Sequence, residues 1–198
     1  MARDPLANPA LKKVCMRLVV IAAIFSVLVS YVALDCDGSG GEDTPMKFKL
    51  NSHSFSDGGN IPKKYTCDAE DVSPELHWTD PPPAAKSFAL IVDDPDAPSR
   101  TWVHWVLFDL PGDSHALPEA AGKRASLPNG AQQGTNDFGK AGYGGPCPPP
   151  GKPHQDFFKL YALDSRPSLK GSATKVDVEK AMQGHILGRG ELMGQYGR

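Results

Sequence analysis

The sequence predicts a mainly β domain with one helix near its C-terminal end. Three apolar runs have the length of buried strands: residues 87–92 (SFALIV), 102–110 (WVHWVLFDL) and 157–163 (FFKLYAL). Of the 198 residues, 20 are glycine and 19 are proline, well above the usual share of about 12% for the two together. Because both residue types interrupt helices, a mostly helical fold is excluded.

The remaining strands are weaker and shorter. Residues 46–50 (MKFKL) alternate between apolar and polar, which is the pattern of a half-buried strand. Residues 74–78 (PELHW) are a short strand candidate, and residues 191–196 (ELMGQY) add a last strand. Residues 113–152 are rich in Gly, Pro, Asn and Ala and form one long predicted loop. A structureless loop of this length in a compact domain is usually functional.

One segment has a convincing helical pattern, residues 175–187. Thr174 is placed to cap its N-terminus, acidic residues occupy its first turn, and Gly188 follows its end. The predicted apolar stripe of this helix consists of Val178, Met182 and Ile186.

A separate segment precedes the domain. Residues 18–34 form an uncharged run of 17 mostly apolar residues, with basic residues before it and acidic residues after it. This charge bias is typical of a secretory signal or signal anchor whose basic side stays in the cytoplasm. We expect a signal or anchor segment with a flexible linker over residues 1–43, left uncleaved as a transmembrane anchor, and an extracytoplasmic (periplasmic or secreted) domain over residues 44–198. A cleaved signal peptide and a buried core helix are the alternatives.

The composition excludes several functional classes. A formal net charge of -2 and a pI near 6.3 lack the basic footprint of a dedicated nucleic-acid binder, so we expect no nucleic-acid partner. The sequence contains no Walker A loop, no nucleophile-elbow motif, no metalloprotease motif and no CxxC pair. Cys67 and Cys147 allow one disulfide in an oxidising compartment, and the sequence leaves open whether they form it.

Polar residues lie at the ends of the strong strands. Asp94 and Asp96 follow the first strong strand in a proline-stiffened turn, where they could bind a cation, orient a histidine or act as acid and base. The glycine- and proline-rich residues 139–151 precede His154, and their backbone N–H groups could form an anion-binding nest. For each of these segments, an ordinary solvated turn or surface loop is the alternative.

His104 lies inside a strongly apolar strand. Strand alternation places Trp102, His104 and Val106 on one face and Val103, Trp105 and Leu107 on the other. A lone histidine in such a strand is more often a hydrogen-bonded core residue than a ligand, so both interpretations stay open at this point.

Taken together and in this order, these motifs resemble the phosphatidylethanolamine-binding protein family, in particular its bacterial Raf-kinase-inhibitor-like branch. The segments that carry the resemblance are DDPDAP, WVHWVLFDLPG, GYGGPCPPPG followed by a histidine, and KLYALD. The segments YTCDAEDVSPELHW and GHILGRGELMGQYGR are similar too. The resemblance covers residues 46–198, which is nearly the whole predicted domain.

The resemblance implies a β-sandwich of two antiparallel sheets with a C-terminal helix and a small pocket for phosphate-type anions or phospholipid head groups. The pocket residues that it implies are Asp94, Asp96, His104, Gly145 with its neighbour Pro146, and His154. The family usually has Arg-Tyr after the second histidine, where this chain has Gln155-Asp156. An inward-pointing Asp156 would add a third carboxylate to the pocket and weaken the binding of a phosphate.

The implied function is that of a non-catalytic binding module, which by analogy alone inhibits or regulates an enzyme partner such as a kinase or a protease. We expect no catalytic residue, no cofactor and no resident metal, and contact with the membrane through the N-terminal segment. The alternative is a metal-dependent phosphoesterase or other hydrolase that uses the Asp and His residues of the pocket as metal ligands. Because protonated histidines bind anions best, we expect phosphate affinity to rise as the pH falls from about 8 to 6.

Overall fold

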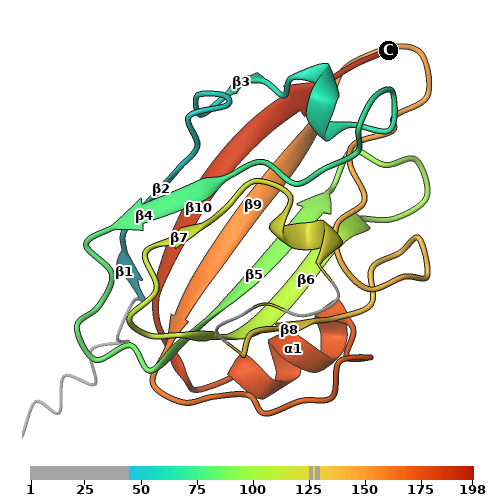
Figure 1. Cartoon of the computed structure of the whole chain (residues 1–198). Helices are drawn as coiled ribbons and strands as arrows, with labels where there is room; N and C mark the ends of the chain where they lie inside the picture. Colours follow the sequence, from blue (N-terminus) through green and yellow to red (C-terminus); the bar gives the residue numbers. More distant parts are fainter. Residues whose placement is uncertain (1–44, 125–126, 128–129) are drawn as a thin grey trace, which may run out of the picture. The chain divides into compact units, whose positions relative to one another are not determined.

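The computed structural model describes residues 45–124, 127 and 130–198, and within them the strands form two layers (Figure 1). A large sheet of seven strands faces a small sheet of three, and α1 packs on the opposite face of the large sheet. The prediction of a mainly β sandwich with a helix near the C-terminus is therefore confirmed.

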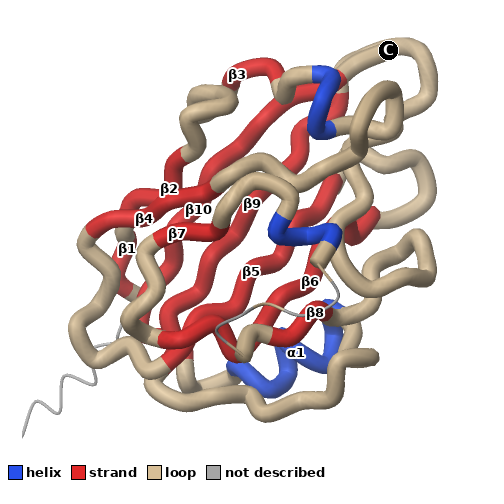
Figure 2. Tube along the Cα trace, viewed as in Figure 1, coloured by secondary structure: helices blue, strands red, loops and turns tan. Residues whose placement is uncertain are grey.

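The large sheet has the strand order β1-β10-β9-β5-β6-β8, with β3 also paired to β10. Its strands are β1 (Met46–Lys47), β3 (Gly59–Asn60), β5 (Ser87–Asp94), β6 (Trp102–Pro111), β8 (Gln132–Gln133), β9 (His154–Leu163) and β10 (Ile186–Tyr196). The small sheet consists of β2 (Lys49–Asn51), β4 (Leu76–Thr79) and β7 (Ala116–Leu117). The helical elements are α1 (Lys175–Met182) and two short 3₁₀ helices over Lys63–Tyr65 and Ala121–Lys123 (Figure 2).

Most strand pairs are antiparallel, as predicted, and the exceptions involve β10. β1 and β3 each pair with β10 in parallel over two residues, at opposite ends of that strand. These short pairings fix the start of the domain against the last strand of the large sheet.

The predicted strand over residues 46–50 is interrupted at Phe48. β1 pairs with β10 in the large sheet, whereas β2 pairs with β4 in the small sheet. Phe48 is buried between the two pairings and packs edge-on against Phe88. The chain thus crosses from one layer to the other in a segment whose alternating pattern predicted a single strand.

The core between the sheets is built by alternate residues of β5 and β9. Leu90, Val92 and Phe158 belong to this core, and all three are almost fully buried. Because side chains alternate along a strand, Asp94 and Asp156 are the next positions on the same inner face. Two carboxyl groups therefore continue the apolar rows of neighbouring strands.

A β-bulge in β6 changes the predicted faces of that strand. The residues on either side of His104 pair with consecutive residues of β5, so His104 is the extra residue. Val103 lies with Val106 in the cluster under α1, while Trp105 belongs to the core between the sheets. The prediction that Val103 shares a face with Trp105 and His104 with Val106 is wrong, because a bulge resets the alternation.

The helix is shorter than predicted. α1 begins after Thr174, which forms a capping box with Asp177, and it ends at Met182. Gly184 has a φ of 76°, a left-handed conformation that glycine adopts readily and that terminates helices. Ile186 therefore begins β10 instead of completing the helical stripe.

The chain divides into two units, residues 1–40 and residues 41–198. The predicted anchor over residues 18–34 and most of the predicted linker lie outside the described residues. Among the residues that the structure describes, no helix is long and apolar enough to cross a membrane.

Candidate ligand-binding site

A cavity of about 300 Å³ lies at one end of the large sheet, where β5, β6 and β9 begin or end. It is lined by Asp94, Ala97, Pro98, Trp102, His104, Phe138, Cys147, Pro148, Pro149 and His154. The structure thus brings together three of the five residues that the resemblance implies, namely Asp94, His104 and His154. The other two, Asp96 and Gly145, do not line the cavity.

Asp94 is held by two hydrogen bonds at the end of β5. Its Oδ2 atom accepts a hydrogen bond from Nδ1 of His154 at 2.7 Å, and its Oδ1 atom accepts one from the backbone N–H of Asp96 at 2.7 Å. Asp96 itself is exposed, and its carboxylate accepts a hydrogen bond from the backbone N–H of Gln155 at 2.9 Å. Asp96 therefore joins the turn after β5 to the start of β9.

His104 is fixed in one tautomer by the glycine-rich loop. Its Nδ1 atom lies 2.7 Å from the carbonyl oxygen of Gly144. Because a carbonyl oxygen only accepts hydrogen bonds, Nδ1 carries the proton, and Nε2 of the neutral ring is left with a lone pair. Burial lowers the pKa of His104 below its ordinary value of 6.5. The structure therefore does not support the expectation that His104 binds an anion as an imidazolium near pH 6.

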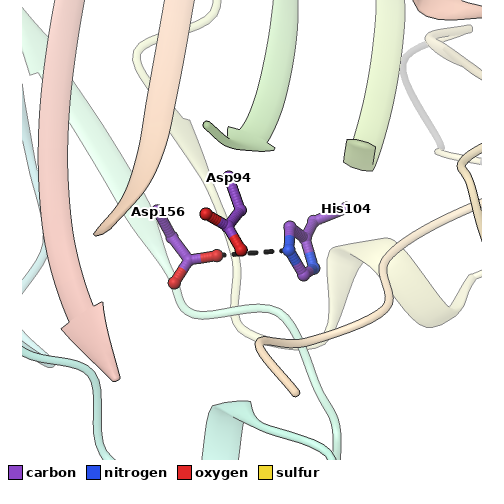
Figure 3. Close-up of side chains that lie close together, drawn as sticks. All are labelled: Asp94, His104 and Asp156. Carbon is purple, nitrogen blue, oxygen red and sulfur yellow. Dashed lines mark ion pairs between the residues drawn. The ribbon is translucent and has the colours of Figure 1, made fainter. Parts of the chain in front are cut away.

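Asp156 is buried beside His104, although it is not among the residues that line the cavity. Its Oδ1 atom lies 3.2 Å from Nε2 of His104, and the two side chains are 1% and 3% exposed. Figure 3 shows that Asp94, His104 and Asp156 point toward one another from three different strands. Burial, followed by the nearby carboxylates Asp94, Asp93 and Asp96, raises the pKa of Asp156 well above 3.8.

The backbone N–H of Gly145 is engaged in a protein contact. It donates a hydrogen bond to Oδ1 of Asp71 at 2.6 Å. A Cβ atom at this position would lie 2.3 Å from the carbonyl oxygen of Tyr65. The glycine therefore allows two backbone segments to approach each other, and its N–H group is not free for the anion-binding role that the family resemblance implies.

An aromatic wall of the cavity was not predicted from the sequence. Trp102 and Phe138 pack edge-on with their ring centroids 5.4 Å apart. Arg100 lies over the Trp102 ring at 5.4 Å, and Lys140 lies over the Phe138 ring at 5.6 Å. A single phenylalanine in a polar glycine-rich loop, 42% exposed in the structure, was the available signal for Phe138.

A disulfide joins the cavity wall to the first half of the domain. Cys147 is bonded to Cys67, 80 residues earlier in the chain. The backbone N–H of Cys67 also donates a hydrogen bond to the carbonyl oxygen of Pro146. The Cys147 sulfur is therefore not a free thiol in this structure.

The arrangement suits binding better than group transfer. The cavity combines an aromatic wall, two histidines and the carboxylate of Asp94. The Asp94, Asp96, His104 and His154 metal set of the hydrolase alternative does not assemble, since Asp96 points to the backbone of Gln155 outside the cavity.

Comparison with known proteins identifies one family model and several similar relatives. A family model described as phosphatidylethanolamine-binding protein matches residues 51–197. A UPF0098 protein of Methanothermobacter thermautotrophicus is 53% identical over 149 residues, which cover 75% of this chain and 98% of the relative. A UPF0098 protein of Aquifex aeolicus is 48% identical, with 74% of this chain and 86% of the relative covered.

Two solved structures have the same fold. The phosphatidylethanolamine-binding protein homologue CT736 from Chlamydia trachomatis superimposes with a TM-score of 0.70 and 39% identity, covering 77% of this chain and 98% of its own. Escherichia coli YbcL is described as a new member of the mammalian phosphatidylethanolamine-binding protein family. It superimposes with a TM-score of 0.73 and 35% identity, covering 76% of this chain and 98% of its own.

Proposed function

Because this chain belongs to the phosphatidylethanolamine-binding protein family, we propose that it is a non-catalytic binding module whose cavity receives a phosphate-type anion or a phospholipid head group. The observation that carries the proposal is the cavity at the end of the large sheet, where His154 meets the aromatic wall of Trp102 and Phe138. Its volume of about 300 Å³ is at the lower end for small-molecule sites. This size suits a head group better than a whole lipid.

The cavity has a polar part and an apolar part, which suit a ligand that has a charged phosphate and an apolar substituent. His154 lies at the mouth with its side chain 12% exposed and its orientation set by Asp94. The rings of Trp102 and Phe138 offer an apolar wall, and the cations of Arg100 and Lys140 lie beside them. A phosphate near the histidine and the rim cations, with its apolar substituent along the rings, uses both surfaces.

Calorimetry with phosphoethanolamine, inorganic phosphate and a short-chain phosphatidylethanolamine tests the proposal. We expect saturable binding of at least one of these ligands at one site per chain, weakened at least tenfold in His154→Ala. The matched control is His185→Ala, because His185 forms an exposed pair with Asp164 at 2.8 Å that resembles the His154–Asp94 pair at 2.7 Å. Absence of binding by all three ligands, or equal loss in both variants, would contradict the proposal.

We also propose that the domain works outside the cytoplasm, held by its N-terminal segment. The charge bias around residues 18–34 supports this, and so does the disulfide between Cys67 and Cys147. Regulation of a kinase or protease partner stays a prediction from the family resemblance.

A further inference from the structure

We propose that Asp94, His104 and Asp156 bind a divalent metal ion of the zinc or manganese class beside the cavity that Asp94 and His104 line. Each residue offers one ligand atom, and these atoms lie within 4.8 Å of one another. The three side chains come from the neighbouring strands β5, β6 and β9 and point toward a common centre (Figure 3). The inference does not rest on the proposed function, since the ion binds to the protein without a head group.

The buried atoms that face this centre lack hydrogen-bond partners. Nε2 of His104 and both carboxyl oxygens of Asp156 have none. Buried polar groups in native proteins are nearly always satisfied, so each exception needs an explanation. A metal ion bound between these atoms would satisfy His104 Nε2 and at least one Asp156 oxygen.

The surrounding contacts orient the proposed ligands as metal sites require. The hydrogen bond from Nδ1 of His104 to the Gly144 carbonyl directs the Nε2 lone pair toward the centre. The hydrogen bonds from His154 and from the Asp96 N–H fix the carboxylate of Asp94. Metal-binding histidines and carboxylates characteristically have such outer partners, which set the tautomer and the ring orientation.

The charge of the neighbouring carboxylate, Asp93, is balanced by two lysines. Asp93 points to the opposite face of the sheet, where Lys159 and Lys175 each contact it at 2.5 Å. Among the ion pairs of the described residues, Asp156 has only His104 as a partner, and burial disfavours the charge on both. A divalent cation would supply the positive charge that the lysines supply to Asp93.

The donor set determines the class of ion. Two carboxylates and one imidazole suit zinc, manganese and ferrous ions, whereas sites for copper(I) use sulfur and sites for calcium use oxygen alone. Three protein ligands leave at least one coordination position free. Asp94 and His104 line the cavity, so this position faces the space in which a ligand oxygen would lie.

Titration of the tag-free, chelator-treated full chain with Zn²⁺ alone, followed by calorimetry and metal analysis, tests the inference. We expect one ion per chain, with affinity reduced at least tenfold in Asp156→Asn and in Asp94→Asn. Asp164→Asn removes an exposed carboxylate that also contacts a histidine, and it should bind as the wild type does. Circular dichroism of each variant establishes that it folds.

A second experiment uses the wild-type chain and needs no variant. Crystals soaked in Zn²⁺ or Mn²⁺ should give an anomalous-scattering peak between Asp94, His104 and Asp156. Absence of this peak together with absence of one-to-one binding overturns the inference. Binding that Asp156→Asn retains at wild-type affinity overturns it too, because the ion would then sit at an adventitious surface site.

Discussion

His104 and Asp156 face each other beside the cavity, with Nε2 of the histidine 3.2 Å from Oδ1 of the aspartate. Each is nearly inaccessible to solvent, and neither of these two atoms has a hydrogen-bond partner. The pair lies beside Asp94 on the inner face of the large sheet, where Asp94 and Asp156 follow the apolar core residues of β5 and β9. A carboxyl group in this position is a stability cost that the fold retains, and this makes it the first target for mutation.

Asp156→Asn should stabilise the metal-free protein. The asparagine side chain has nearly the same volume, carries no charge and can donate a hydrogen bond to Nε2 of His104. We expect the free energy of unfolding to rise by about 1–3 kcal/mol, the usual cost of an unsatisfied buried polar group. Urea denaturation at pH 7.5 with a chelator measures it, and Asp164→Asn is the exposed control. A loss of stability in Asp156→Asn would show that the carboxyl group stabilises the fold.

Loss of the disulfide should weaken both the fold and the cavity. The Cys67–Cys147 bond closes a loop of 80 residues, and removal of such a bond costs about 2–4 kcal/mol. The double variant Cys67→Ser, Cys147→Ser should lose this amount in urea unfolding, and reduction of the wild type should have the same effect. Since Cys147 and the two prolines after it line the cavity, head-group affinity should fall as well. Unchanged stability in both arms would contradict the prediction.

Gly145→Ala should destabilise the domain because of crowding. The added Cβ would lie 2.3 Å from the Tyr65 carbonyl oxygen and 2.8 Å from the Thr66 Cα, so the backbone must shift at a typical cost of about 1–3 kcal/mol. Thermal unfolding measures the effect. Gly171→Ala is the matched control, because the nearest atoms to its Cβ are 3.7 Å away. Equal melting temperatures for the two variants would show that the close approach at Gly145 is relaxed in solution.

The stability of the domain should depend on the ionisation of Glu75. Burial alone would raise the pKa of Glu75, but hydrogen bonds from Ser54, His53 and Ser52 outweigh it and lower the pKa below 4.5. Because the folded-state pKa is the lower one, the stabilisation is complete above about pH 4.5, the unfolded value, and is lost as the pH falls through the folded-state pKa. Glu75→Gln should flatten the decrease in melting temperature below pH 5. The control Glu70→Gln, at an exposed position, should leave this decrease unchanged. Parallel pH profiles for the wild type and Glu75→Gln would refute this assignment.

The orientation of the chain across a membrane can be tested with a reporter fused after Arg198. We expect alkaline phosphatase, which is active only where disulfides form, to be active in the fusion with the full chain. The same fusion without residues 1–43 should be inactive, because the basic and apolar segment that is predicted to direct export is missing. Activity that does not depend on residues 1–43 would contradict the predicted anchor.

Local sequence patterns were sufficient for the strong strands. The apolar runs at residues 87–92 and 102–110 begin at the first residues of β5 and β6, and the structure extends these strands by two residues and one residue. β9 begins three residues earlier than its apolar run because His154, Gln155 and Asp156 pair with β10 despite being polar. The helix start was predictable from Thr174 and the acidic first turn, whereas its end depended on the left-handed conformation of Gly184.

The mainly β class follows from the apolar runs of the sequence, and the cavity residues Asp94, His104 and His154 follow from contiguous motifs that resemble the family. The bulge at His104, the contact of Gly145 with Asp71 and the burial of Asp156 beside His104 could not be predicted from the sequence. Each of these facts depends on which strand or loop lies alongside. Such neighbours are distant in the chain, and their register is set by the packing of both sheets together.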